Sequence, residues 1–246
     1  MPELLPIPFR RTIPIDLYKQ LTNFIESNHL SAFSHISSQD IARTHQARQR
    51  LAKLDISFVG LQNLILYHEM VLKLAYIIEG NNTGIEFTWI ETLSFKAKTV
   101  VSTSFKFEEQ NVLYNIGCMY SLLGVENFSK ADPKCIAQSC KLFQQAATCF
   151  NRVLAELGEH EDRNTLESIL SLMKAQAQEM FWLKAVRDGK LGNRTVARLA
   201  KQTSVYYLTA GESSKKSPVM TSQWGAFLEG KKLYFEAVSL YRLSLT

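Results

Sequence analysis

The sequence predicts a mainly all-α protein, and three observations support this. Only 11 glycines and 6 prolines occur in 246 residues, fewer than a turn-rich β-sandwich or barrel uses. Four of the prolines lie in the first fourteen residues and none occurs between Leu17 and Asp132, so long helices can form there without a break. Apolar residues recur at helical spacing through most of the chain. With 46% hydrophobic residues, the chain can bury a sizeable core as one large domain or two small ones.

The first half of the chain begins with an extended, proline-punctuated segment over residues 4–14. Helical spacing then predicts helices over about 15–28, 39–53 and 58–79. The third of these ends at the Gly-Asn-Asn-Thr-Gly segment 80–84, which is a strong terminator, and a new unit opens at Phe87.

The middle of the chain is predicted to form an antiparallel helical hairpin. Its first helix covers about 107–123 and ends at Gly124, where a left-handed cap is favourable, and its second runs from Pro133 to about residue 157. The residue types match a tetratricopeptide repeat, but Phe143 lies ten residues beyond the repeat position of that aromatic. No second copy follows, so one repeat-like hairpin within a larger helical scaffold is expected.

Three more helices complete the prediction. Asn164 and Thr165 can cap a long helix that ends at Gly189. Further helices are expected over about 194–210 and from Ser222 onward. The apolar periodicity is still running at Thr246, so we expect one helical domain over 1–246 that is incomplete at its C-terminus.

Charge is mildly basic and spread along the sequence. There are 28 Lys and Arg against 23 Asp and Glu, a net charge of +5. A dedicated nucleic-acid binder is therefore not expected. The densest basic stretch is Arg43, Arg48, Arg50 and Lys53. Because no aromatics alternate with it, a solvated helix face is favoured over contact with acidic lipid headgroups or an acidic partner.

No pattern of catalytic or metal-binding residues is found, so we expect neither an enzyme nor a cofactor or metal. None of the histidines forms a zinc-type pair; they are His29, His35, His45, His68 and His160. The acidic pairs Glu108-Glu109 and Glu159-Glu161 lie at helix ends, where helix-dipole or solvated roles are favoured. Cys118, Cys135, Cys140 and Cys149 lack zinc spacing and indicate a reduced, cytoplasmic protein. No apolar run is long enough to span a membrane, which leaves only peripheral or partner-mediated membrane contact.

Four segments together resemble the Bro domain, the helical N-terminal module of ALIX-like ESCRT-associated scaffolds. They are 5–12 (LPIPFRRT), 86–89 (EFTW), 114–120 (YNIGCMY) and 175–185 (AQAQEMFWLKA). The first and third look most like the fungal PalA-type branch, which serves ambient-pH signalling. The resemblance runs in order along essentially the whole chain, and the AQAQE run beside two aromatics is its most specific part.

The resemblance implies a curved helical solenoid with a tetratricopeptide-like core and a small N-terminal β-sheet. It also implies a non-enzymatic scaffold whose hydrophobic groove binds the C-terminal amphipathic helix of a Snf-type (CHMP-type) ESCRT-III subunit. The protein would be cytoplasmic and recruited to endosomes, and a pH-signalling protease and transcription-factor complex would bind through regions absent here. The pH-signalling and cargo-sorting members of the family share this groove.

The resemblance implies five groove positions, which are Phe181, Leu199, Thr195, Cys140 and Phe143. Phe181 could instead be a core residue of its helical stripe, Cys140 and Phe143 could be plain packing residues, and Thr195 could cap or solvate its helix.

Two alternatives belong to other functional classes. A tetratricopeptide-type adaptor would bind an extended peptide or a C-terminal carboxylate through polar clamps such as Asn115 with Lys or Arg on adjoining helices. An enzyme using Cys149 or Cys118 would need a thiolate that titrates well below the ordinary cysteine value of about 8.5.

Overall fold

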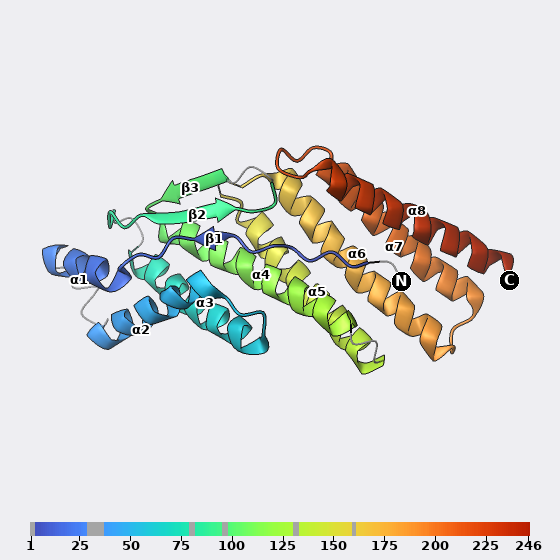
Figure 1. Ribbon diagram of the computed structural model, residues 1–246, viewed down its shortest axis with the longest axis horizontal. Coiled ribbons are helices and arrows are strands. Elements are labelled where there is room, and N and C mark those ends of the chain that lie inside the picture. The colour runs from blue at the N-terminus through green and yellow to red at the C-terminus, as the bar shows by residue number, and fades with distance from the viewer. Residues whose placement is uncertain (1–2, 29–36, 79–81, 95–97, 130–132, 159–160) are drawn as a thin grey trace. The chain divides into compact units, whose positions relative to one another are not determined.

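The computed structural model is mainly helical, as predicted (Figure 1). It describes residues 3–28, 37–78, 82–94, 98–129, 133–158 and 161–246. The helices are α1 (Leu17–Asn28), α2 (Ser38–Gln49), the 3₁₀ helix η2 (Arg50–Lys53), α3 (Phe58–Ile78), α4 (Phe105–Ser129), α5 (Pro133–Ala155), α6 (Arg163–Asp188), α7 (Asn193–Ser214) and α8 (Ser222–Ser244). The strands are β1 (Arg11–Thr12), β2 (Phe87–Glu91) and β3 (Lys98–Ser102). In the part of the chain that is described, no helix combines the length and hydrophobicity needed to cross a bilayer.

The chain divides into two compact units. The sheet unit comprises Phe9–Thr92 and Lys96–Ile116, and the bundle unit comprises Met1–Pro8, Leu93–Phe95 and Gly117–Thr246. Each unit buries aromatic side chains of its own, such as Trp89 in the sheet unit and Phe150 in the bundle unit.

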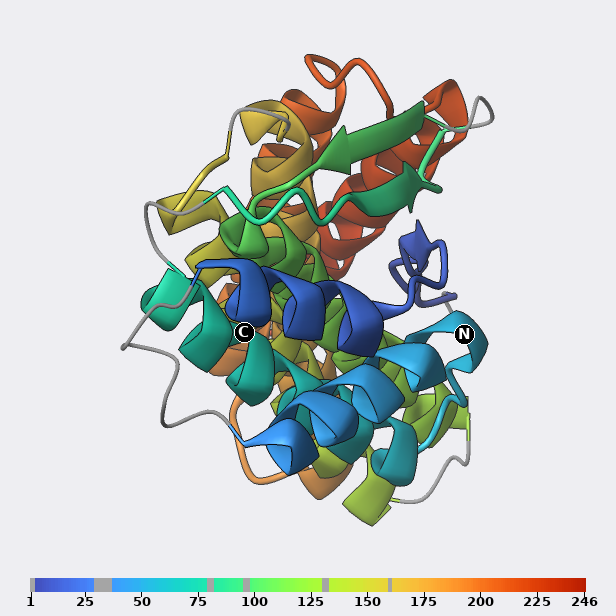
Figure 2. The ribbon, with the colours of Figure 1, turned by 90° about the vertical axis from the view of Figure 1, so that its left-hand side faces the viewer.

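The sheet unit contains the small β-sheet that the family resemblance implied. The order is β1-β2-β3 and both pairings are antiparallel, so Trp89 of β2 lies opposite Thr12 on one side and Val100 on the other. Phe87 and Trp89 alternate with half-buried residues along β2 and are themselves buried, which is the period-2 pattern of a strand with one face in the core. Figure 2 shows α1 alongside α2, and α2 also packs against α3.

A buried polar cluster corrects two expectations in this unit. The expected solvated basic face is wrong for Arg48, which is 1% exposed. Its Nε donates to Glu108 Oε1 at 3.0 Å, and Tyr67 and Trp89 donate to the same carboxylate at 2.8 and 2.6 Å. Glu108 is therefore not a solvated helix-end residue. A buried carboxylate needs such donors because its desolvation is otherwise costly.

The neighbouring carboxylate, Glu109, is also buried with a hydrogen-bonding partner, which is a histidine. Glu109 is buried, and Nε2 of His68 lies 2.6 Å from its Oε1. His68 is therefore a buried histidine with a hydrogen-bonding partner. His29, His35, His160 and Glu159 lie outside the described residues. Among the described residues, no group of three or more His, Cys, Asp or Glu could hold a metal ion.

In the bundle unit, α5 packs against α6, α6 against α7, and α7 against α8. The predicted hairpin of α4 and α5 is present, but the prediction that Gly124 ends its first helix is wrong, since α4 continues to Ser129. A Cβ at Gly124 would lie 2.9 Å from the Phe143 ring, and one at Gly117 would lie 2.9 Å from the Phe150 ring. Both glycines therefore allow close packing of α4 against α5 rather than a turn.

The ends of α6 are set by two local signals. Asp162 caps its N-terminus by accepting a hydrogen bond from the Thr165 amide at 2.7 Å, so the cap predicted at Asn164 and Thr165 was two to three residues too late. Gly189 ends the helix as predicted, with a left-handed φ of 63°.

The AQAQE segment of α6 points two of its polar side chains into the bundle unit. Gln176 is fully buried and bonds both backbone groups of Leu5, accepting from its amide at 2.6 Å and donating to its carbonyl at 3.1 Å. Glu179 accepts from both Lys231 of α8 and Tyr207 of α7. These two residues therefore tie the N-terminal segment, α7 and α8 to α6.

Candidate binding groove

An open hollow of about 450 Å³ lies on the bundle unit between three helices. We call it the Phe181 groove. It is lined by Gln144, Ala147 and Thr148 from α5, by Lys174, Ala177, Gln178 and Phe181 from α6, and by Tyr206 from α7. Helices rather than loops hold all eight side chains, which keeps the groove preformed.

Phe181 is a surface residue, although it follows a buried helical stripe. Half of its surface is exposed, whereas Ala177 and Met180 are buried. The reason is its angular position on α6. Lys174, Gln178 and Phe181 follow one another at spacings of four and three residues, which places them on one face of the helix. That face is the one that opens into the groove.

The other positions implied by the resemblance are distributed differently. Cys140 is half-buried on α5, one turn before Gln144, and its thiol donates to the Ala177 carbonyl at 3.3 Å. Phe143 is fully buried, and its ring contacts the α4 backbone at Gly124. Phe143 therefore packs in the core, as its alternative interpretation holds, and does not line the groove.

Leu199 and Thr195 lie on α7, on the same face as Tyr206. The spacings of four and seven residues between Thr195, Leu199 and Tyr206 are those of one helical stripe. Leu199 is half-buried and Thr195 is exposed. Neither residue lines the hollow itself. The contact of Ser168 with the Ala210 carbonyl sets the register of α6 and α7, and it places Leu199 and Thr195 level with the Phe181 end of the groove.

The groove has a polar end and an apolar end, and the register of the antiparallel helices shows which residues lie at each end. Cys140 meets Ala177, so residues after Cys140 on α5 lie toward the start of α6. Ser168 donates to the Ala210 carbonyl, so residues near the end of α7 also lie toward the start of α6. The polar end thus holds Lys174 with Gln144, Thr148 and Tyr206. The apolar end holds Phe181, with Cys140 close by.

Sequence reasoning did not identify Lys174, Gln178 or Tyr206 as groove residues. A signal was present in the sequence, since Lys174 and Gln178 interrupt the long apolar helix at the spacing that ends on Phe181. Polar residues that share a face with an aromatic indicate that this face meets solvent. Tyr206 carries no comparable signal, because the buried Tyr207 follows it directly.

A buried ionic network fixes α7 and α8 against α6. The Lys231 ammonium lies 2.8 Å from both oxygens of Glu179, and the Tyr207 hydroxyl donates to Oε2 at 2.6 Å. Burial raises the pKa of Glu179 despite these partners, and burial lowers the pKa of Lys231. Both shifts have one cause, since desolvation outweighs the mutual attraction.

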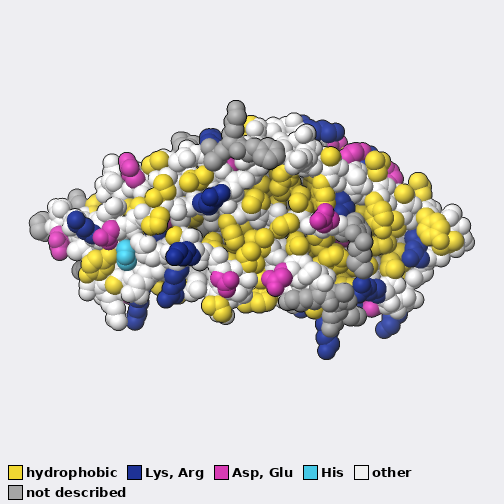
Figure 3. All heavy atoms as spheres, in the orientation of Figure 1, with side chains coloured by type: hydrophobic (Ala, Val, Ile, Leu, Met, Phe, Trp, Pro, Cys, Tyr) yellow, Lys and Arg dark blue, Asp and Glu magenta, His cyan; other side chains and the backbone are white. Residues whose placement is uncertain are grey.

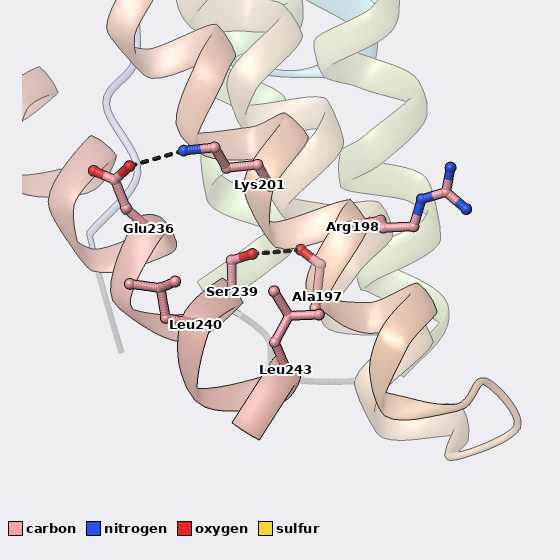
Figure 4. A pocket seen from close by; sticks show the side chains of 7 residues that line it. All are labelled: Ala197, Arg198, Lys201, Glu236, Ser239, Leu240 and Leu243. Carbon is pink, nitrogen blue, oxygen red and sulfur yellow. Dashed lines mark hydrogen bonds and ion pairs between the residues drawn. The ribbon is translucent and has the colours of Figure 1, made fainter. Parts of the chain in front are cut away.

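A second hollow lies between α7 and α8 and is shown in Figure 4. Its volume is about 270 Å³. Lys201 already pairs with Glu236 at 2.8 Å, and the Ser239 hydroxyl donates to the Ala197 carbonyl at 2.9 Å. The Arg198 side chain points away from α8 (Figure 4). With these polar groups engaged, this hollow offers a partner less chemistry than the Phe181 groove does.

Asn115 and Cys149 do not have the properties that a peptide clamp and a catalytic thiol require. Asn115 is 1% exposed, and its side-chain amide bonds both backbone groups of Arg10 at 2.9 Å. Its hydrogen-bonding groups are thus engaged within the sheet unit. Burial raises the pKa of Cys149 to about 11, and the thiol of Cys118 lies 3.2 Å from the Pro8 carbonyl. A thiol with so high a pKa is not an activated nucleophile.

A model of the BRO1-like domain family matches residues 4–246. The chain belongs to the BRO1-like domain family. It is 38% identical over 251 residues to the pH-response regulator protein palA/RIM20 of Saccharomyces cerevisiae, covering 100% of this chain and 37% of that protein. The Kluyveromyces lactis protein of the same name is 34% identical, with coverage of 100% and 38%. The chain thus spans a little over a third of the length of these relatives.

Solved BRO1 structures have the same fold. The structure named "ALIX BRO1 CHMP4C complex" gives a TM-score of 0.84 at 21% identity, covering 98% of this chain and 72% of that one. The structure named "Structure basis for endosomal targeting by the Bro1 domain" gives 0.86 at 17% identity, with coverage of 99% and 70%.

On the face that Figure 3 shows, Lys and Arg side chains lie singly or in small groups among acidic and uncharged ones, as their spread along the sequence predicts.

Proposed function

We propose that this chain is a scaffold module whose Phe181 groove binds the C-terminal amphipathic helix of a CHMP-type (Snf-type) ESCRT-III subunit. The observation that carries the proposal is Phe181 itself, an aromatic with half of its surface exposed in an open hollow between three helices. A groove of this kind accepts the apolar face of an amphipathic helix, and a central aromatic supplies much of the binding energy.

The comparisons support both the partner and the setting. A structural neighbour is named as a complex of a BRO1 domain with CHMP4C, and the relatives in two yeasts are named as pH-response regulators. We therefore place this module in a fungal ambient-pH signalling scaffold that is recruited to endosomal membranes by an ESCRT-III subunit. The signalling protease and the transcription factor would bind parts of the protein outside these 246 residues.

The test is Phe181→Asp, measured by fluorescence anisotropy with a labelled peptide of the CHMP4C C-terminal helix. The carboxylate is solvated in the free protein but becomes buried and unpaired in the complex. Truncating or replacing an aromatic of this kind costs about 2–4 kcal/mol, so we expect the affinity to fall at least about thirtyfold.

The matched control is Tyr76→Asp, which makes the same kind of change at an aromatic of the sheet unit that is 81% exposed. It should bind like the wild type, and both variants should melt near the wild-type temperature. If Phe181→Asp binds normally, the groove assignment is wrong. If it loses cooperative melting, Phe181 is a core residue and the proposal fails.

A further inference from the structure

Among the described residues that line the Phe181 groove, Lys174 is the only charged one. The remaining seven lining residues are neutral. Lys174 is exposed, and within the described part of the chain its ammonium forms no ion pair or hydrogen bond. This contrasts with Lys184 on the same helix, which pairs with Asp188. The charge of Lys174 is thus available to a molecule that enters the groove.

Three groups around Lys174 can donate hydrogen bonds to a ligand. Gln144 and Gln178 offer amide N–H groups and Tyr206 offers a hydroxyl, whereas the Thr148 hydroxyl already donates to the Gln144 carbonyl at 3.0 Å. None of the described lining residues is a carboxylate. This end therefore suits an anionic oxygen ligand, whereas an apolar side chain placed there would bury the ammonium without a partner.

Lys174 also stands at a defined distance from the aromatic. The two residues are seven positions apart on one face of α6, which corresponds to about 10 Å at 1.5 Å per residue. A helix lying along α6 presents its own residues i and i+7 on one face with the same separation. A bound helix can therefore place one side chain over Phe181 and another beside Lys174 at the same time.

We propose that the groove recognises a carboxylate on the bound helix about two turns away from the apolar residue that covers Phe181, with Lys174 as the group that pairs with it. This inference rests on the proposed function and names the chemistry by which the groove selects its ligand. Lys174 discriminates among amphipathic helices of similar apolar face, because only one with an Asp or Glu at this position compensates the lysine when solvent is excluded.

The test combines charge reversal on both sides. The probes are the labelled CHMP4C C-terminal peptide and a set of peptides in which each acidic residue in turn is replaced by lysine. They are titrated against the wild type, Lys174→Glu, Phe181→Asp and the control Lys19→Glu. Lys19 is exposed on α1 of the sheet unit, so its reversal gives the same change in net charge without touching the groove.

We expect Lys174→Glu to weaken binding of the unmodified peptide about tenfold and Lys19→Glu to weaken it less than twofold. One lysine-substituted peptide should bind Lys174→Glu more tightly than it binds the wild type. The difference between wild type and Lys174→Glu should shrink at 1 M salt, where the screening length is about 3 Å.

The outcomes separate the two proposals. If Phe181→Asp abolishes binding but Lys174→Glu behaves like Lys19→Glu, the groove is real and the carboxylate proposal is overturned. The carboxylate proposal is also overturned if no substituted peptide restores binding to Lys174→Glu. If Phe181→Asp binds the peptide like the wild type, the proposed function falls, and the inference about Lys174 falls with it.

Discussion

Replacing Lys231 by methionine tests the buried network that fixes α6 against α8. Lys231 and Glu179 are each only 4% exposed in their side chains, and the ammonium contacts both carboxylate oxygens at 2.8 Å. Methionine keeps most of the stem but leaves the carboxylate without its cation. Removing one partner of a buried pair costs about 3–5 kcal/mol. For a chain of this size, with about 2–4 °C per kcal/mol, we expect the melting temperature to fall by about 10 °C.

The cost of Lys231→Met should depend on pH in a definite direction. Burial already raises the folded-state pKa of Glu179, and removing the nearby ammonium raises it further. A carboxyl whose folded pKa lies above its unfolded value stabilises the fold fully below the unfolded value, about 4.3. That stabilisation is lost as the pH rises through the folded pKa. Lys231→Met should therefore be less destabilised relative to wild type at pH 5 than at pH 8.

The measurement is urea unfolding of wild type and variant at both pH values, followed by far-UV circular dichroism. A loss below 1 kcal/mol at pH 8, or an equal loss at both pH values, would refute the argument. The double variant Glu179→Met/Lys231→Met gives an independent check. It removes both charges, so it should be more stable than Lys231→Met alone at pH 8, although the Tyr207 hydroxyl loses its acceptor.

Four further predictions concern other parts of the chain. Gly124→Ala should lower the free energy of unfolding by about 1–3 kcal/mol, because its Cβ would meet the Phe143 ring at 2.9 Å. In the same melting experiment Gly230→Ala, which has open space and lies within α8, should raise it by about 0.5–1 kcal/mol. Burial raises the pKa of Glu109, but hydrogen bonds from a histidine and a lysine outweigh this and leave it lowered. Its contribution is therefore present above the unfolded pKa and lost as the pH falls through the folded one, so Glu109→Gln should flatten the acid limb of a stability profile. With a pKa of about 11, Cys149 should resist iodoacetamide at pH 8 in the native protein and react in urea, as mass spectrometry would show.

The sequence identified the helices well because their apolar stripes depend on local spacing. The prediction was wrong at Gly124, because a glycine that ends a helix and a glycine that allows close helix packing look the same in a sequence. A glycine after an apolar run favours a left-handed cap, but here it removes a Cβ that would collide with the Phe143 ring on the next helix. Only the packing of α4 against α5 separates the two cases, and that packing joins residues 19 positions apart.

Buried charges were the other failure, for a related reason. Arg48 and Glu108 each look like solvated helix residues when their own segments are considered. They pair across 60 positions, and the carboxylate also collects Tyr67 and Trp89. The periodicity within one segment does not indicate contacts between residues so far apart in the sequence. The AQAQE run was predictable only in part. The sequence marked it as the most specific segment of the family resemblance, but it did not show that Gln176 and Glu179 are buried and bond to other segments.

Some residues of the candidate site could be predicted from the sequence and others could not. Phe181 could be proposed from the resemblance, and its exposure on α6 agrees with a surface role. Phe143 was named from the same resemblance as the residue one turn beyond Cys140, yet it lies in the core, since an aromatic at helical spacing does not reveal which neighbour covers it. Lys174 was missed because a single lysine on a long helix is ordinary until a groove forms beside it.

The position of α6 explains why so few residues define the groove. The helix packs against α5 on one side and α7 on the other, so most of its circumference is buried. Glu179 points into the bundle, where Lys231 and Tyr207 hold it. The stripe that remains for a partner consists of a cation, an amide and an aromatic at fixed separations, Lys174, Gln178 and Phe181. Because the three residues lie on one face of a single helix, the helical rise fixes their separations, and the spacing of charge and apolar surface on the ligand must match them.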